Sequence, residues 1–234
     1  MSAVYKRDLR AYFASPLGYV FLMAFLLVIN IYFWATCVYT GNNSMESVFS
    51  FMVYMMIFMI PILTMRTFSE DYKQKTDQLL LTAPVKPSGI VLGKFFSALT
   101  VFAVALLFTL LFVVVIAAKG TLNAATTIGN YIAIFSVACC YISIGVFISS
   151  LTENQLVSCI ATLGAFLALY LVDYTYNLLN VTWIKNIIYW ISIFRRYNSF
   201  NSGVFSIADF FYYISIAAVF VFLTVRVLEK KRWS

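Results

Sequence analysis

Residues 90–118, IVLGKFFSALTVFAVALLFTLLFVVVIAA, form an apolar block of 29 residues with one charged side chain, Lys94, near its start. A helix needs about 20 mainly apolar residues to cross the hydrocarbon core of a bilayer. This block is long enough to cross with a tilt or to project beyond the lipid. A membrane β-barrel would instead show segments of about ten residues with alternating polarity. The block therefore predicts a membrane-spanning helix.

Five further blocks have the same character, and together they predict an all-α integral membrane protein with six transmembrane helices. These blocks are residues 17–39, 48–65, 128–151, 156–172 and 207–225. Of the 234 residues, 63% are hydrophobic and 11% are charged, whereas soluble domains carry roughly 25% charged residues. The composition excludes a soluble globular protein and a disordered chain. We expect residues 1–234 to form one transmembrane domain.

The basic residues are distributed unequally between the two sides of the predicted bundle. The N-terminal stretch, the connection after the second span and residues 226–232 together hold 12 of the 16 Lys and Arg residues. The opposite side holds Lys119, Lys185, Arg195 and Arg196. Because cytoplasmic loops are enriched in Lys and Arg, we expect both termini in the cytoplasm. This topology explains the net charge of +7 without a nucleic-acid partner.

Two short segments outside the spans are amphipathic or apolar. Residues 1–16 place Tyr5, Leu9 and Tyr12 on one helical face, which predicts an interfacial helix that ends near Pro16; a solvated basic leader is the alternative. Residues 181–194, VTWIKNIIYWISIF, make a helix of about 21 Å at 1.5 Å per residue. Since the hydrocarbon core is about 30 Å thick, we expect this segment to be re-entrant or interfacial on the outer face.

Charged residues at the outer ends of the spans form a second candidate group. Asp173 and Asp209 lie there, where they can be hydrated or pair with Arg195, Arg196 or Lys185. Arg195 and Arg196 break the charge bias, and we expect them to pair with Asp173 or Asp209, or with lipid headgroups. We expect these pairs to anchor the outer segment or an outer gate. A direct role in translocation is the alternative, because acids within membranes commonly line transport paths. The middle of the predicted membrane carries no charge, so an ion-coupled carrier is disfavoured.

The cytoplasmic connection after the second span, RTFSEDYKQKTDQLLLTAPVKPSG (residues 66–89), predicts an amphipathic helix. Thr67-x-x-Glu70 has the spacing of a capping box, which would start the helix at residue 67. Pro84 would end it near Thr82. One face holds the apolar side chains Phe68, Tyr72 and Leu79. Because the chain has no neighbouring domain that could bury this stripe, we expect a separate partner to do so. Glu70 is either a cap or a contact with a cytoplasmic partner that docks on this helix.

The chain offers no candidate catalytic, cofactor or metal site. It contains no histidine, and it lacks the G-x-x-x-x-G-K-[ST] loop that binds nucleotide phosphates. The four cysteines lie in apolar blocks without a C-x-x-C pair, which is typical of packing residues. We therefore expect a protein that is not an enzyme.

Two stretches resemble a known family. MRTFSEDYKQKTDQLLLTAPVKPSGIVLGKF (residues 65–95) resembles the cytoplasmic stretch of ABC-2 type transporter permeases. The matching positions are Glu70, Thr76, Leu79, Leu80, Pro84, Gly93 and Lys94. Residues 195–233, with Phe200, Gly203, Asp209 and the final VRVLEKKRW, are similar to permeases grouped with the gliding-motility transporter.

The resemblance implies the permease subunit of an ABC exporter in a bacterial inner membrane. Two permeases, either identical or sisters, would form the path, and separate ATPase subunits would carry ATP and Mg²⁺. A membrane-anchored accessory subunit often joins such permeases. The outer segment, residues 174–206, would close the path. The residues implied in ATPase coupling are Phe68, Glu70, Asp71, Tyr72, Thr76, Leu79 and Leu80. The alternative function is a non-transporting scaffold that transmits ATP-driven changes to an accessory complex.

Overall fold

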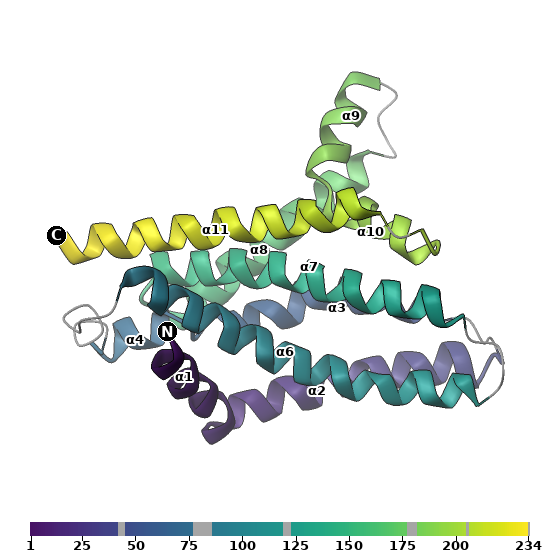
Figure 1. Ribbon diagram of the computed structural model, residues 1–234, viewed down its shortest axis with the longest axis horizontal. Helices are drawn as coiled ribbons and strands as arrows, with labels where there is room; N and C mark the ends of the chain where they lie inside the picture. Colours follow the sequence, from purple (N-terminus) through teal and green to yellow (C-terminus); the bar gives the residue numbers. More distant parts are fainter. Residues whose placement is uncertain (42–44, 77–85, 119–122, 177–181, 205, 234) are drawn as a thin grey trace.

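The chain is an elongated helical bundle (Figure 1), seen here in a computed structural model. The structure describes residues 1–41, 45–76, 86–118, 123–176, 182–204 and 206–233. Its long helices are α2 (Pro16–Phe33, continued by a π-helical turn at Trp34–Val38), α3 (Glu46–Thr64), α6 (Pro87–Ala117), α7 (Ala124–Leu151), α8 (Gln155–Thr175) and α11 (Ile207–Trp233). Its short helices are α1 (Ser2–Ala14), α4 (Ser69–Lys73), α9 (Thr182–Ile191) and α10 (Ile193–Asn201).

The predicted number of spans is confirmed. Six helical stretches among the described residues are long and apolar enough to cross a membrane, and each overlaps one of the six predicted blocks. The protein is therefore a multi-pass membrane protein. The N-terminus, α4 and the C-terminal part of α11 lie at one end of the bundle (Figure 1), which we call the inner end. The C-terminal end of α6 and the start of α7 lie at the opposite end (Figure 1), which we call the outer end.

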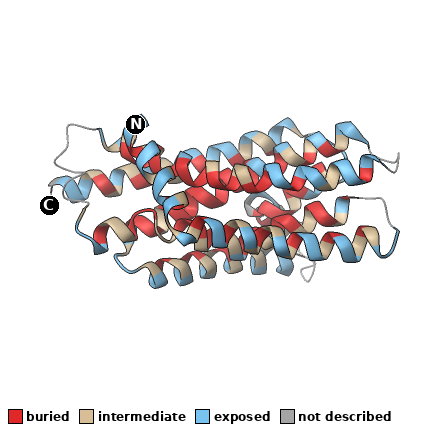
Figure 2. Ribbon diagram, turned by 90° about the horizontal axis from the view of Figure 1, so that it is seen from below, coloured by how far each residue is buried: buried red, intermediate tan, exposed pale blue. Residues whose placement is uncertain are grey.

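Helix α7 forms the centre of the bundle. In its most apolar stretch 78% of the residues are buried, compared with 17% in α8 and 22% in α11. Figure 2 shows the buried positions gathered along the inside of the bundle, while the outer faces remain exposed to the surroundings. Small residues let α7 approach its neighbours closely. At Gly145, for example, an added Cβ would clash with the Thr64 hydroxyl of α3.

Helix α1 is separate from the first span and packs across α6. Ser15 has extended backbone angles and Pro16 begins α2, so the chain turns where the sequence predicted. A Cβ added at Gly93 of α6 would lie 3.1 Å from the Cβ of Val4, which shows how closely the two helices approach. Besides apolar residues, α1 also contributes a largely buried charge, since the side chain of Asp8 is only 12% exposed.

The predicted short outer segment is present as two helices. α9 has ten residues, about 15 Å of helix at 1.5 Å per residue, so it is too short to cross a bilayer. It projects sideways from the outer part of the bundle (Figure 1) and exposes Trp183 and Trp190. α10 follows at once and lies against the bundle through buried residues such as Phe194 and Tyr197.

Candidate functional site

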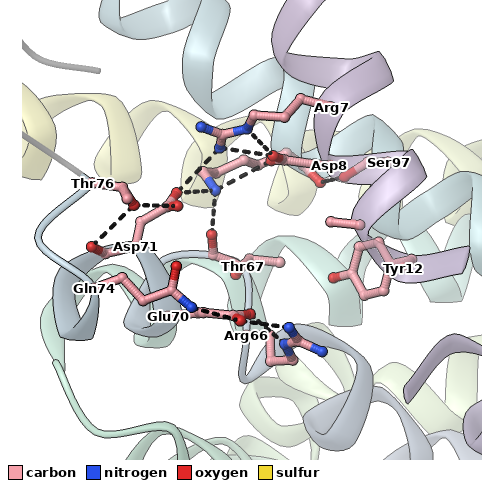
Figure 3. A pocket seen from close by; sticks show the side chains of 12 residues that line it. Arg7, Asp8, Tyr12, Arg66, Thr67, Glu70, Asp71, Gln74, Thr76 and Ser97 are labelled. Carbon is pink, nitrogen blue, oxygen red and sulfur yellow. Dashed lines mark hydrogen bonds and ion pairs between the residues drawn. The ribbon is translucent and has the colours of Figure 1, made fainter. Parts of the chain in front are cut away.

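A buried ion cluster lies at the inner end, where α1, α4 and α6 meet (Figure 3). At its centre is Lys94 of α6, whose side chain is 3% exposed. The Lys94 ammonium forms ion pairs with Asp71 of α4 at 2.5 Å and with Asp8 of α1 at 3.2 Å. It also donates to the carbonyl oxygen of Thr67. We call Arg7, Asp8, Asp71 and Lys94 the inner ion cluster.

Arg7 closes the cluster from the solvent side. Its guanidinium lies 2.7 Å from Asp8 and 3.3 Å from Asp71, and its side chain is 44% exposed. Burial alone would lower the pKa of Arg7, but the neighbouring carboxylates of Asp8 and Asp71 raise it above its usual value. Two cations thus face two carboxylates, so the buried charges are mutually compensated, as groups removed from water must be.

Buried hydrogen bonds fix α4 on the bundle. The Ser149 hydroxyl of α7 accepts from the backbone N–H groups of Phe68 and Ser69, at 3.1 and 3.2 Å, and the Ser69 hydroxyl donates to the Ser149 carbonyl oxygen at 3.2 Å. Ser69 is completely buried. Because backbone groups at the start of a helix otherwise lack partners, these bonds replace a local cap and attach α4 to the central helix.

Two aromatic residues, Phe68 directly before α4 and Tyr72 within it, face the chain's own bundle. Phe68 is 2% exposed and lies under the Lys94 ammonium, 5.0 Å from its ring centroid. Tyr72 is 8% exposed, and the Lys231 ammonium of α11 lies 3.6 Å from its ring centroid. The expectation that no neighbouring part of the chain buries this apolar stripe is therefore wrong. These side chains anchor α4 to α6 and α11.

The predicted capping box is also wrong. The Thr67 hydroxyl donates to the Thr64 carbonyl oxygen, and Glu70 pairs with Arg66, so neither side chain reaches a free N–H of α4. The helix begins at Ser69 and ends at Lys73, and Lys75 has a positive φ of 55°, which interrupts the helix expected to run to Thr82.

Of the other residues predicted to take part in ATPase coupling, Thr76 lies beside the inner ion cluster. Leu79 and Leu80 lie outside the described residues. Thr76 donates to the Asp71 carboxylate at 3.0 Å and so holds the turn after α4 against the inner ion cluster. The exposed side of this turn consists of Lys73, Gln74 and Lys75. The predicted coupling segment therefore has a buried face fixed to the bundle and an exposed face that is polar and basic.

A cavity of about 270 Å³ opens beside the cluster and is lined by residues of α1, the α3–α4 connection, α4 with the turn after it, and α6 (Figure 3). Tyr12 closes one side and donates to the Leu63 carbonyl oxygen at 2.9 Å. Burial raises the pKa of Tyr12, and the charge of Asp8 raises it further, so the phenol stays protonated and keeps this bond. The Arg66 guanidinium donates to the Ser15 hydroxyl at 3.0 Å, across the break between α1 and α2.

A second group of ion pairs lies at the outer end and contains the four predicted residues. Arg196 pairs with Asp209 at 2.6 Å, and both side chains are 6% exposed. Arg195 pairs with Asp173 at 3.1 Å. The acids that were expected to compensate the two arginines therefore do so. They join α10 to the outer ends of α8 and α11.

Further hydrogen bonds spread the attachment of α10 over the bundle. Tyr197 donates to the Asn130 side-chain oxygen of α7 at 3.0 Å, and Asn201 donates to the Ser50 hydroxyl of α3 at 3.0 Å. The Tyr213 hydroxyl of α11 donates to the Ile193 carbonyl oxygen at 2.7 Å. α10 thus lies near the outer end of the bundle and contacts four of the long helices, α3, α7, α8 and α11.

The grouping of Arg7, Asp8 and Lys94 into one site was not predicted from the sequence. The available signal was Lys94 itself, a cation inside an apolar block that must find a counter-charge when buried. Among the described residues, no group of three or more His, Cys, Asp or Glu side chains could hold a metal ion.

Comparison with known proteins gives one family. The sequence profile of the family described as ABC-2 family transporter protein matches residues 42–229. The matched range runs from before α3 into the last turns of α11, and it includes α4, Lys94 and the outer ion pairs. A search of curated proteins gives no match.

Proposed function

This chain belongs to the ABC-2 transporter family, and we propose that it is the permease subunit of an ATP-driven exporter. Its role is that of the transmembrane component and not of the ATPase itself. We place it in the inner membrane of a bacterium with both termini in the cytoplasm, in line with the charge distribution. ATP and Mg²⁺ would be bound by separate ATPase subunits.

The observation that best supports the proposal is the way α4 is packed and bonded to the long helices at the inner end. Its buried face is fixed to α6, α7 and α11 through Phe68, Ser69 and Tyr72, and Asp71 joins it to α1. The turn at Lys73–Lys75 instead exposes its polar and basic side chains. A partner that binds the exposed turn would therefore act directly on the packed ends of several spans.

The mechanism we propose uses this attachment as a mechanical link. Binding of ATP would draw together the ATPase subunits of a permease pair, either two copies of this chain or one copy and a sister permease. The exposed turn after α4 would move with its ATPase, and the inner ion cluster would pass the movement to α1 and α6. Packed helices respond to such displacements by shifting between discrete arrangements. α10, with its ion pairs, would form the outer closure of the path, and a membrane-anchored accessory subunit would associate with the complex.

Charge reversal on the exposed turn tests the proposal. The variant Lys73→Glu/Lys75→Glu leaves the buried anchors in place, and the matched control is Lys230→Glu, an exposed lysine of α11. A partner surface complementary to this basic turn would be acidic, and the two introduced glutamates would repel it. We therefore expect the double variant to lower affinity for the ATPase subunit at least tenfold, about 1.4 kcal/mol.

The readouts are co-purification of the ATPase subunit and ATP hydrolysis by the complex reconstituted in lipid. We expect both to fall in the double variant and to remain at the wild-type level in the control. If the double variant assembles and hydrolyses ATP like the wild type, the coupling role of this turn is refuted. Tyr72→Ala is less selective, because it also removes a buried anchor of α4.

A further inference from the structure

An apolar groove opens sideways from the bundle, between α6 and α11, with α7 as its floor. Its volume is about 920 Å³. Leu99 and Ala103 contribute to the α6 wall, Ala218 and Phe222 to the α11 wall, and Cys139 to the floor. Small side chains on both walls leave the space open. We call this the lateral groove; it lies within spans and so faces the hydrocarbon region of the bilayer.

The lining of the lateral groove suits a hydrocarbon chain. One of its few hydroxyls, Thr100, already donates to the Phe96 carbonyl oxygen at 2.8 Å and shares a hydrogen bond with the Tyr5 hydroxyl at 3.0 Å. Along α6 the lining runs from Ser88 to Ala103, about 22 Å at 1.5 Å per residue. One leaflet contributes about 15 Å of hydrocarbon. The groove is thus long enough to hold an acyl chain of one leaflet along its whole length.

The inner end of the lateral groove is positively charged. Arg226 lies with its guanidinium 5.0 Å from the ring centroid of Phe222, a wall residue, and its side chain is 64% exposed. Lys86 is exposed two residues before Ser88, where the lining of α6 begins. The charge of Arg226 is partly balanced by Glu229 at 3.1 Å. With Lys86, the inner end of the lateral groove therefore keeps a net positive charge next to its apolar lining.

We propose that the lateral groove binds one acyl chain of an anionic phospholipid from the leaflet at the inner end, with the phosphate near Lys86 and Arg226. The alternative occupant, a helix of a second copy, fits the groove less well. Close helix packing in membranes is favoured by small residues at the contact. The sideways opening of the lateral groove instead carries the exposed rings of Phe96, Phe135 and Phe222. A flexible acyl chain can pass between such rings. The proposal depends on the membrane location and not on ATPase coupling.

The test measures lipid that stays bound to the purified protein. The protein is equilibrated in bilayers of equal parts phosphatidylglycerol and phosphatidylcholine with identical acyl chains, extracted in mild detergent and analysed by native mass spectrometry. We expect one retained phosphatidylglycerol in the wild type. Ala218→Trp fills the groove and should abolish this retention. The matched control is Val219→Trp, at the neighbouring exposed position of α11 that does not line the groove.

A second pair of variants tests the headgroup contact. Lys86→Gln/Arg226→Gln should lower the preference for phosphatidylglycerol over phosphatidylcholine roughly 25-fold, since each cation near an anionic lipid surface contributes about fivefold. Lys230→Gln, which removes a basic residue outside the lining, should leave the preference unchanged. An unchanged preference in the double variant overturns the assigned headgroup position.

Two results would overturn the groove assignment itself. The first is phosphatidylglycerol retention by Ala218→Trp equal to that of the wild type. The second is conversion of a dimer to a monomer by Ala218→Trp while lipid retention is unchanged, which would make the groove an interface between copies. Ala103→Trp fills the same space from the α6 wall, so the test does not depend on how well one variant folds.

Discussion

Replacing Lys94 by methionine should destabilise the folded permease strongly. Methionine keeps much of the length of the side chain but removes the charge that pairs with Asp71 at 2.5 Å and Asp8 at 3.2 Å. Removing one partner of a buried ion pair costs about 3–5 kcal/mol, because the other charge stays buried and uncompensated. Arg7 still faces both acids, although it is 44% exposed. We therefore expect a loss of about 2–3 kcal/mol, below or at the lower end of that range.

Thermal unfolding of the detergent-purified protein, followed by tryptophan fluorescence, measures this effect. For chains of about 150–250 residues, 1 kcal/mol corresponds to roughly 2–4 °C in Tm, by the scaling found for soluble domains. The expected decrease in Tm for Lys94→Met is thus about 4–12 °C. Lys230→Met, at an exposed position of α11, is the control and should change Tm by less than about 2 °C, because solvated surface charges contribute little.

A triple variant identifies the physical cause. In Asp8→Asn/Asp71→Asn/Lys94→Met the buried charges are removed together, and replacing a whole buried ionic group by neutral side chains is often close to neutral in stability. We expect the triple variant to recover at least half of the Tm lost in Lys94→Met. A single variant as stable as the wild type, or a triple variant less stable than the single one, would refute the reasoning that charge compensation holds α1, α4 and α6 together.

Two further predictions concern the outer end. Asp209→Asn leaves the Arg196 guanidinium buried without its counter-ion and should lower Tm by several degrees, whereas the double change with Arg196→Gln should lower it less; equal losses would contradict a charge effect. In a chain without its native cysteines, single cysteines at Tyr174 and Ser202 should react with a membrane-impermeant maleimide from the same side of the membrane, because α9 is too short to cross; labelling from opposite sides would mean that the segment between them spans the bilayer.

The spans could be predicted because the signal for them is local. Each block needs only length and apolarity, both of which are read within some 20 residues, and the structure places a helix over every one. The ion pairs at the outer end could also be predicted from the sequence. Arg195 and Arg196 lie in a short segment between two spans that carry Asp173 and Asp209 at their ends, so few alternative partners existed.

The inner ion cluster could not be predicted because its members are far apart in the sequence. Asp8 and Lys94 meet only because α1 turns back across α6 at Gly93. The same limit explains the wrong prediction for Phe68 and Tyr72. An amphipathic pattern shows that a face will be buried but not by what, and here Lys94 and Lys231 lie over these rings within the same chain.

The central position of α7 has a consequence for the time course of synthesis. Its most extensive packing is against α11, which is separated from it by 55 residues of the chain. A ribosome that adds about 5–20 residues per second needs roughly 4–16 s to go from Leu151 to Trp233. During that interval α7 has left the ribosome while its main neighbour is still being made. The newly inserted bundle therefore passes through a stage in which α7 already packs on α3 and α6 while its side that faces α11 is still uncovered.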